Sequence, residues 1–233
     1  ASIYEGRYLA GIAAGMKTES NKLGYVAAFP FAEVISGYTA FYLGAKSVNP
    51  DVTMDIMYTN SWNDPTVESQ VAQALIDRGC DVISQHSDST APATTAEDNG
   101  VWQVGYNNDM IEAAPNASLI SPRIDWGIYV TEAVQDVIDG KEIPVDWCKG
   151  LEDGAVYLSP LNTDIAAEGT QEAIDEAQEK LISGEIHVFD GPLSGVSPEG
   201  EKYEVPEGEY YHEQEESSAP SWLYIIDGCN VVE

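Results

Sequence analysis

The chain has few basic residues: 10 Lys and Arg stand against 40 Asp and Glu among 233 residues, which gives a formal net charge of −30. A chain this acidic repels phosphate backbones and anionic lipid head groups, so nucleic acids are excluded as partners. Long apolar runs are also missing, because no stretch approaches the roughly eighteen consecutive apolar residues of a membrane-spanning helix.

Cysteine is scarce as well. Cys80, Cys148 and Cys229 form an odd set without the C-x-x-C spacing of a zinc or redox site. We expect Cys80 in the core because it leads into an apolar strand. A disulfide between two of the three remains open and would imply an exported protein. The three histidines are not paired at ligand spacing, so we expect neither a metal site nor a cofactor.

Apolar residues make up 43% of the chain, enough for a packed core, and they fall in short alternating segments. Helical spacing predicts helices at residues 3–17, 31–48, 66–78, 91–99, 127–139 and 163–183. Apolar runs predict strands at residues 24–29, 52–58, 81–84, 101–105, 117–121, 155–158 and 222–226. This alternation predicts an α/β fold with a parallel sheet flanked by helices.

Two of the predicted strands end in small polar residues. The segments 81–89 and 101–110 each begin as an apolar run, and they end in the polar residues Gln85, His86, Asp88, Asn107 and Asp109. In open α/β sheets, ligands are held at the carboxyl ends of parallel strands. The pattern therefore predicts a crevice for a small polar molecule.

Several motifs follow one another in fixed order at residues 4–11 (YEGRYLAG), 24–30 (GYVAAFP), 60–65 (NSWNDP), 74–83 (ALIDRGCDVI), 85–89 (QHSDS) and 105–110 (GYNNDM). Together they resemble the basic membrane protein (BMP) family of ABC-transporter substrate-binding lipoproteins. The resemblance implies a type I periplasmic-binding-protein fold, in which two α/β lobes close on a ligand, commonly a purine base or nucleoside. It also implies an ABC permease as partner and an exported protein, at the cell surface or in the periplasm, whose signal and lipid anchor lie outside this chain.

The same resemblance implies a domain organisation. Residues 1–122 are expected to form the second lobe, residues 123–160 a crossover segment and a helix belonging partly to the first lobe, and residues 161–233 a return to the second lobe. Most of the first lobe, with its share of the site, would then be a segment of the same protein that is missing from this chain. Residues 199–216 hold eight Glu and one Lys. We expect a solvated acidic loop there, without the residue spacing of a calcium site.

A purine is a flat π system with donors and acceptors on its edge, so its pocket needs aromatic faces and convergent polar groups. Trp62 and Phe29 each follow a strand and are expected to hold the ring between them. The alternatives are that Trp62 packs a lid without touching ligand and that Phe29 belongs to the core. The family motif adds Asn60, and the point where the family's chain leaves the second lobe adds Asp125 and Trp126.

The polar groups at the strand ends are expected to bind the edge of the ligand. Gln85, Asp88, Asn107 and Asp109 can each supply hydrogen bonds, although Asp and Asn also favour turns and helix caps. His86 is expected to form a hydrogen bond that supports these residues.

The residue type at position 107 bears on the choice of ligand. Nucleoside-binding members of the resembled family carry an Asp there, which accepts protons from two sugar hydroxyls. Asn107 offers one acceptor and one donor group, which suits a nucleobase edge at least as well. The QHSD variant also resembles the branch associated with free purines such as adenine, so the sequence favours a base over a nucleoside.

Two other function classes remain open. A nucleoside hydrolase or phosphorylase would use Asp88 and Asp109 as its carboxylates, but the sequence does not place them at the separation that hydrolysis requires. We therefore expect a binding protein and no enzyme. A ligand sensor with the same fold that serves no transporter is the second alternative.

Overall fold

The computed structural model of the protein describes residues 1–215 and 217–233. Within these residues, five parallel strands form the central sheet in the order β10–β2–β1–β3–β4. The strands are β1 (Lys22–Ala27), β2 (Thr53–Tyr58), β3 (Val82–Gln85), β4 (Trp102–Val104) and β10 (Cys229–Val231). The predicted α/β fold with a parallel sheet is confirmed.

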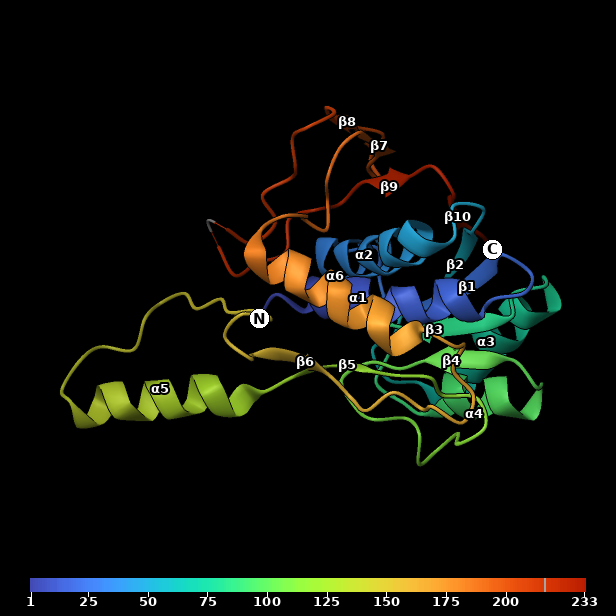
Figure 1. Ribbon diagram of the computed structural model, residues 1–233, viewed down its shortest axis with the longest axis horizontal. Coiled ribbons are helices and arrows are strands. Elements are labelled where there is room, and N and C mark those ends of the chain that lie inside the picture. Colours follow the sequence, from blue (N-terminus) through green and yellow to red (C-terminus); the bar gives the residue numbers. More distant parts are fainter. Residues whose placement is uncertain (216) are drawn as a thin grey trace.

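Helices cover both faces of this sheet (Figure 1). One face carries α1 (Ile3–Lys17) and α2 (Ala32–Val48), and the other carries α3 (Pro65–Asp77) and α4 (Ala91–Asp98). Strands covered on both faces read as continuous apolar runs, and side chains along β1 alternate between the two layers. Leu23 and Tyr25 pack in the core with α1 and α2, whereas Val26 packs in the core with α3 and α4.

The contact between α1 and α2 depends on glycine. A Cβ on Gly11 would lie 2.0 Å from the backbone oxygen of Phe41, and a Cβ on Gly44 would lie 1.9 Å from the backbone oxygen of Tyr8. Any side chain at either position would push the two helices apart. The two helices therefore pack closely together on one face of the central sheet.

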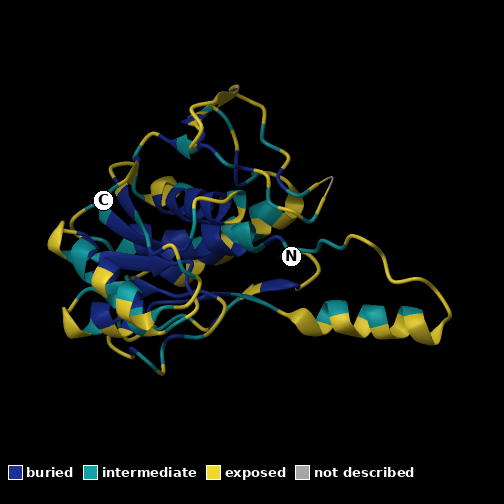
Figure 2. Cartoon of the chain, turned by 180° about the vertical axis from the view of Figure 1, so that it is seen from behind, coloured by how far each residue is buried: buried dark blue, intermediate teal, exposed yellow. Residues whose placement is uncertain are grey.

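Outside the central sheet, β5 (Pro122–Ile124) pairs antiparallel with β6 (Val156–Leu158). Between them, α5 (Trp126–Ile138) has no buried residue and projects from the body, as Figures 1 and 2 show. The helix α6 (Thr170–Ser183) packs on α1. A small antiparallel sheet follows, made of β7 (Leu193–Val196), β8 (Lys202–Val205) and β9 (Ile225–Ile226).

Three predicted segments near the C-terminus differ from the structure. The helix predicted at 163–183 begins only at Thr170, because Gly169 has a left-handed backbone (φ 81°) that separates it from the preceding turns. Residues 199–215 are not wholly a loop, since β8 pairs with β7 through backbone hydrogen bonds that are independent of the glutamates, and residue 216 of the predicted loop lies outside the described residues. The strand predicted at 222–226 is reduced to β9, because Trp222 is fully buried against Phe189 and donates its indole N–H to the Tyr224 carbonyl.

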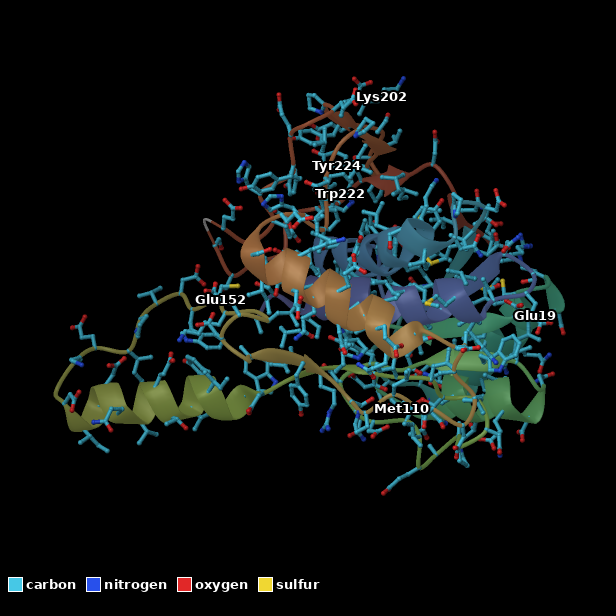
Figure 3. The ribbon with its side chains drawn as sticks, in the orientation of Figure 1. Glu19, Met110, Glu152, Lys202, Trp222 and Tyr224 are labelled. Carbon is cyan, nitrogen blue, oxygen red and sulfur yellow. The ribbon has the colours of Figure 1, made fainter. Side chains whose placement is uncertain are left out.

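The strand predicted at 117–121 is present only as a bridge. Ser118 pairs in parallel with Gln103, and the backbone of this segment follows β4 through hydrogen bonds between Leu119 and Gln103 and between Gly105 and Ile120. The sequence did not predict the strands β5, β7, β8 and β10. Figure 3 shows Trp222 and Tyr224 on the side of the small antiparallel sheet that faces the helices, where the C-terminal segment joins the main core.

Cys80 is buried as predicted, and all three cysteines are free thiols. Burial raises the pKa of the Cys80 thiol to about 12. Among the described residues, no helix combines the length and the apolar character needed to cross a bilayer.

The excess of negative charge predicts salt-dependent stability. Forty acidic side chains repel one another in the compact state, and salt screens this repulsion over distances of about 10 Å at 0.1 M. We expect the melting temperature to rise by roughly 5 °C or more between about 0.05 M and about 1 M KCl. Thermal melts followed by circular dichroism measure this, and an unchanged or lower melting temperature would contradict it.

Candidate ligand-binding site

A hollow of about 530 Å³ lies at the carboxyl ends of the central strands. This volume is within the range of small-molecule pockets. We call it the strand-end hollow, and its lining residues are Ala1, Ile3, Glu33, Trp62, Asp88, Tyr106, Asn107, Ile124, Trp126, Gln214, Ser218 and Pro220.

Four residues predicted from the sequence meet in this hollow. Trp62 follows β2, Asp88 follows β3 and Asn107 follows β4, whereas Trp126 opens α5. A hydrogen bond joins the loop after β2 to the loop after β3: the Asp88 backbone N–H donates to the Trp62 carbonyl at 2.9 Å. Trp62 and Trp126 are 37% and 57% exposed, so their rings are free to contact a ligand.

Phe29 and His86 lie next to the strand-end hollow without lining it. Phe29 is half-buried and stacks on Phe31 with ring centroids 5.2 Å apart, and its ring lies 5.4 Å from that of Trp62. His86 is fully buried, between the rings of Trp62 at 6.2 Å and Tyr106 at 4.6 Å. Neighbouring rings are thus in contact along a series that runs from the exposed Phe31 to the buried Tyr106.

Four other predicted residues are not among those that line the hollow. Gln85 is fully buried, and its amide donates to the carbonyls of Ser87 and Ser89 and accepts from Gln103. The Asp109 carboxylate accepts from the backbone N–H of Ile111, and the Asp125 carboxylate accepts from that of Gly127 as the N-cap of α5. Asn60 is exposed in a turn with a left-handed backbone. The side chains of Gln85, Asp109 and Asp125 thus bind the local backbone.

Beneath Tyr106, one of the lining residues, lies a buried cation that the sequence did not single out. Arg7, on α1, is 1% exposed, and its Nη1 donates to the Gln85 carbonyl at 2.8 Å. Its guanidinium carbon lies 3.9 Å from the ring centre of Tyr106. Among the described residues, its Nε and Nη2 find no hydrogen-bond partner. The cation is therefore stabilised largely by an aromatic face and one carbonyl.

Burial, and secondly the Arg7 charge, lower the pKa of His86 well below its ordinary value. At the rim, partial burial and the nearby Glu68 raise the pKa of Asp88. The residues named above as lining the hollow include two carboxylates, Glu33 and Asp88, and no Lys or Arg. The hollow therefore favours ligands that present hydrogen-bond donors and disfavours anions.

Sequence reasoning missed Glu33 and Tyr106. Tyr106 directly precedes Asn107 in the motif at residues 105–110, and Glu33 follows the end of β1 by six residues. Both residues therefore follow strands of the central sheet, as the predicted residues do. Gln214, Ser218 and Pro220 carry no such signal, because they reach the hollow only through the tertiary fold.

A larger hollow of about 720 Å³ lies in the C-terminal segment and is lined by Tyr203, Tyr210, Tyr211, His212 and their neighbours. It shares Gln214 with the strand-end hollow, but none of its lining residues follows a strand of the central sheet, where α/β folds bind their ligands. The strand-end hollow is therefore the candidate ligand site, because polar and aromatic groups that follow three strands converge there.

Comparisons with known proteins identify the family of this chain. Residues 2–190 match the family model of PnrA-like ABC transporter substrate-binding proteins (Bmp). The chain is 37% identical to a purine-binding protein of Brucella abortus over 83% of this chain and 55% of that protein. It is 38% identical to a putative ABC transporter glucose-binding protein of Haloferax volcanii over 94% of this chain and 55% of that protein.

The fold is also similar to that of an ABC transporter solute-binding protein of Aeropyrum pernix, with a TM-score of 0.68, 21% identity, and coverage of 81% of this chain and 65% of that one. The architecture is thus that of solute-binding proteins. The chain belongs to the PnrA-like (Bmp) family of ABC transporter substrate-binding proteins. It spans about half the length of the curated relatives that it matches.

The neutral His86 predicts a specific pH dependence of stability. In the unfolded chain a histidine takes up a proton as the pH falls through about 6.5, whereas the folded chain keeps His86 neutral. The free energy of unfolding therefore falls below that pH by up to about 1.4 kcal/mol per pH unit from this residue. Urea denaturation between about pH 7 and pH 5.5 measures the slope.

The variant His86→Gln should show a flatter curve, because it loses this proton uptake. The exposed His212, replaced by Gln, is the matched control. Parallel curves for wild type and His86→Gln would show that the buried ring is not the source of the slope.

Proposed function

We propose that the whole protein is the substrate-binding component of an ABC importer, which captures a purine base of the adenine type, or a nucleoside, between two lobes. The observation that carries the proposal is the meeting of Trp62, Asp88, Asn107 and Trp126 in one hollow at the strand ends. Flat aromatic faces beside an amide and a carboxylate are the groups that a heteroaromatic ring requires. The purine-binding relative at 37% identity supports the same ligand class.

The proposal assigns residues 1–122 and 161–233 to the second lobe and residues 123–160 to the crossover and part of the first lobe. Two features support this division: β5 and β6 pair side by side at the base of α5, and β10 returns the chain to the central sheet. On α5, the side chains of Val130, Val134 and Val137 are exposed and share one helical face. In the proposal the first lobe covers this face, and closure of the two lobes traps the ligand and presents it to the permease outside the cytoplasm.

Two other ligands or roles are tested together with the purine. The relative from Haloferax volcanii carries the name of a glucose-binding protein, and aromatic rings beside carboxylates also suit a sugar. A sensor of the same fold would bind the same ligand without a permease. Direct binding measurements separate purine from sugar, and reconstitution with the permease separates import from sensing.

Trp62 provides the sharpest test of the ligand class. Isothermal titration calorimetry of the whole protein with adenine, adenosine and glucose should detect binding of a purine. The variant Trp62→Ala should weaken that binding at least about tenfold, because stacking contributes about 1–3 kcal/mol per base. The variant Trp102→Ala is the control, because it removes an indole at the amino end of β4, whereas the hollow lies at the carboxyl ends of the strands. It should bind the ligand as the wild type does. Binding of glucose alone would refute the proposal, and unchanged affinity in Trp62→Ala would remove this residue from the site.

Asn107 is proposed to set the preference between base and nucleoside. A carboxylate accepts from two sugar hydroxyls, whereas the amide of Asn107 accepts at one group and donates at the other. The variant Asn107→Asp should shift the adenine-to-adenosine affinity ratio toward adenosine by about tenfold. The neighbouring variant Asn108→Asp adds the same charge outside the residues that line the hollow and should leave the ratio unchanged. Equal ratios in the three proteins would count against the role of the amide.

A further inference from the structure

Glu33 lies in the first turn of α2, just beyond the end of β1, and lines the strand-end hollow. Its side chain is 50% exposed, so a ligand in the hollow can reach it. The Oε1 atom lies 4.0 Å from Nε2 of His86. This carboxylate is a strong acceptor that faces the hollow and that a neighbouring ring can orient.

The ring of His86 is held in one orientation. It is fully buried, and its Nδ1 lies 3.5 Å from the hydroxyl of Tyr25. A Cβ on Gly37 would lie 3.0 Å from this ring, so the ring occupies a space that only glycine leaves open. Among the described residues, Nε2 has no hydrogen-bond partner and faces Glu33. A neutral ring that accepts from Tyr25 at Nδ1 and carries its proton on Nε2 fits both neighbours.

The buried Arg7 affects the state of this pair. Its cation lies under Tyr106, whose ring centroid is 4.6 Å from that of His86, and it opposes a second positive charge on the imidazole. His86 therefore faces the Glu33 carboxylate as an uncharged ring, with 4.0 Å between Nε2 and Oε1. The lone pairs of Glu33 that face the hollow stay available to a ligand.

We propose that Glu33 is a specificity-determining residue that accepts a hydrogen bond from an N–H on the ligand edge, with His86 as the positioning residue that orients it. The ligand class is a neutral heteroaromatic ring that bears an exocyclic amine. This inference rests on the proposed purine-binding function and adds the residue that recognises the N–H donors of the ligand. Asp88 contributes a second carboxylate to the lining of the same hollow, which strengthens the preference for donors over acceptors.

The test compares adenine with N6,N6-dimethyladenine, which keeps the ring but lacks the exocyclic N–H donors. In calorimetry of the whole protein, the wild type should prefer adenine by about tenfold or more, since hydrogen bonds to charged groups are the strong ones. The variant Glu33→Met keeps a similar shape without an acceptor and should reduce the preference to less than about twofold. Glu33→Gln keeps one acceptor oxygen without the charge and should give an intermediate ratio.

Glu172 supplies the matched control, because it is an exposed glutamate in the first turn of α6, outside the lining of the hollow. Glu172→Met should keep the wild-type ratio. His86→Phe preserves a buried ring without Nε2 and should lower the ratio while binding of the dimethyl analogue stays unchanged, a result that general loss of structure would not give.

The outcomes separate the two proposals. If the wild type binds adenine and Glu33→Met keeps the full preference, Glu33 does not read the donor edge and the inference fails alone. A wild-type protein that binds neither purine refutes the proposed function, and this inference with it.

Discussion

The strand ends that carry the site are organised around one buried cation. Removing a guanidinium from water is costly unless its surroundings replace the lost hydration, and Arg7 recovers part of it from the Gln85 carbonyl and the face of Tyr106. These partners come from β3 and from the residue two beyond β4, whereas Arg7 itself comes from α1. The cation therefore joins the helix layer to two strand ends. Any displacement of α1 would leave a charge buried without compensation, which makes the floor of the hollow rigid.

The same constraint extends into the helix packing. A Cβ on Gly37 would lie 3.3 Å from Nε of Arg7 and closer still to the ring of His86, so α2 must present a glycine there. Gly11 and Gly44 then allow α1 and α2 to meet backbone to backbone. Small residues at these contacts let a bulky cation and an imidazole occupy the interior beneath a ligand site. Preorganisation of this kind reduces the ordering cost of binding.

Much of the fold was predictable from the sequence, and four of the ten predicted site residues line the strand-end hollow, for a physical reason. Parallel strands bring their carboxyl ends to one edge, so Trp62, Asp88 and Asn107 were placed together without knowledge of the tertiary fold. The sequence did not show which polar residues bind the nearby backbone and do not line the hollow, as Gln85 does at the Ser87 carbonyl. Sequence position gives the loop in which a side chain lies, but the direction of a short polar side chain is set by which backbone N–H or C=O it meets first.

One wall of the hollow, formed by Gln214, Ser218 and Pro220, could not be predicted from the sequence. Gln214, Ser218 and Pro220 lie beyond residue 190, where the family match stops, and no local pattern connects them to the strand ends. Their segment is anchored by Glu213, a carboxylate that is 3% exposed and accepts from Ser36 on α2 and from Ser221 and the backbone N–H of Trp222.

A buried carboxylate that accepts from several donors is well compensated. The hollow thus combines one wall from the residues shared with the family and one wall from a segment outside the match.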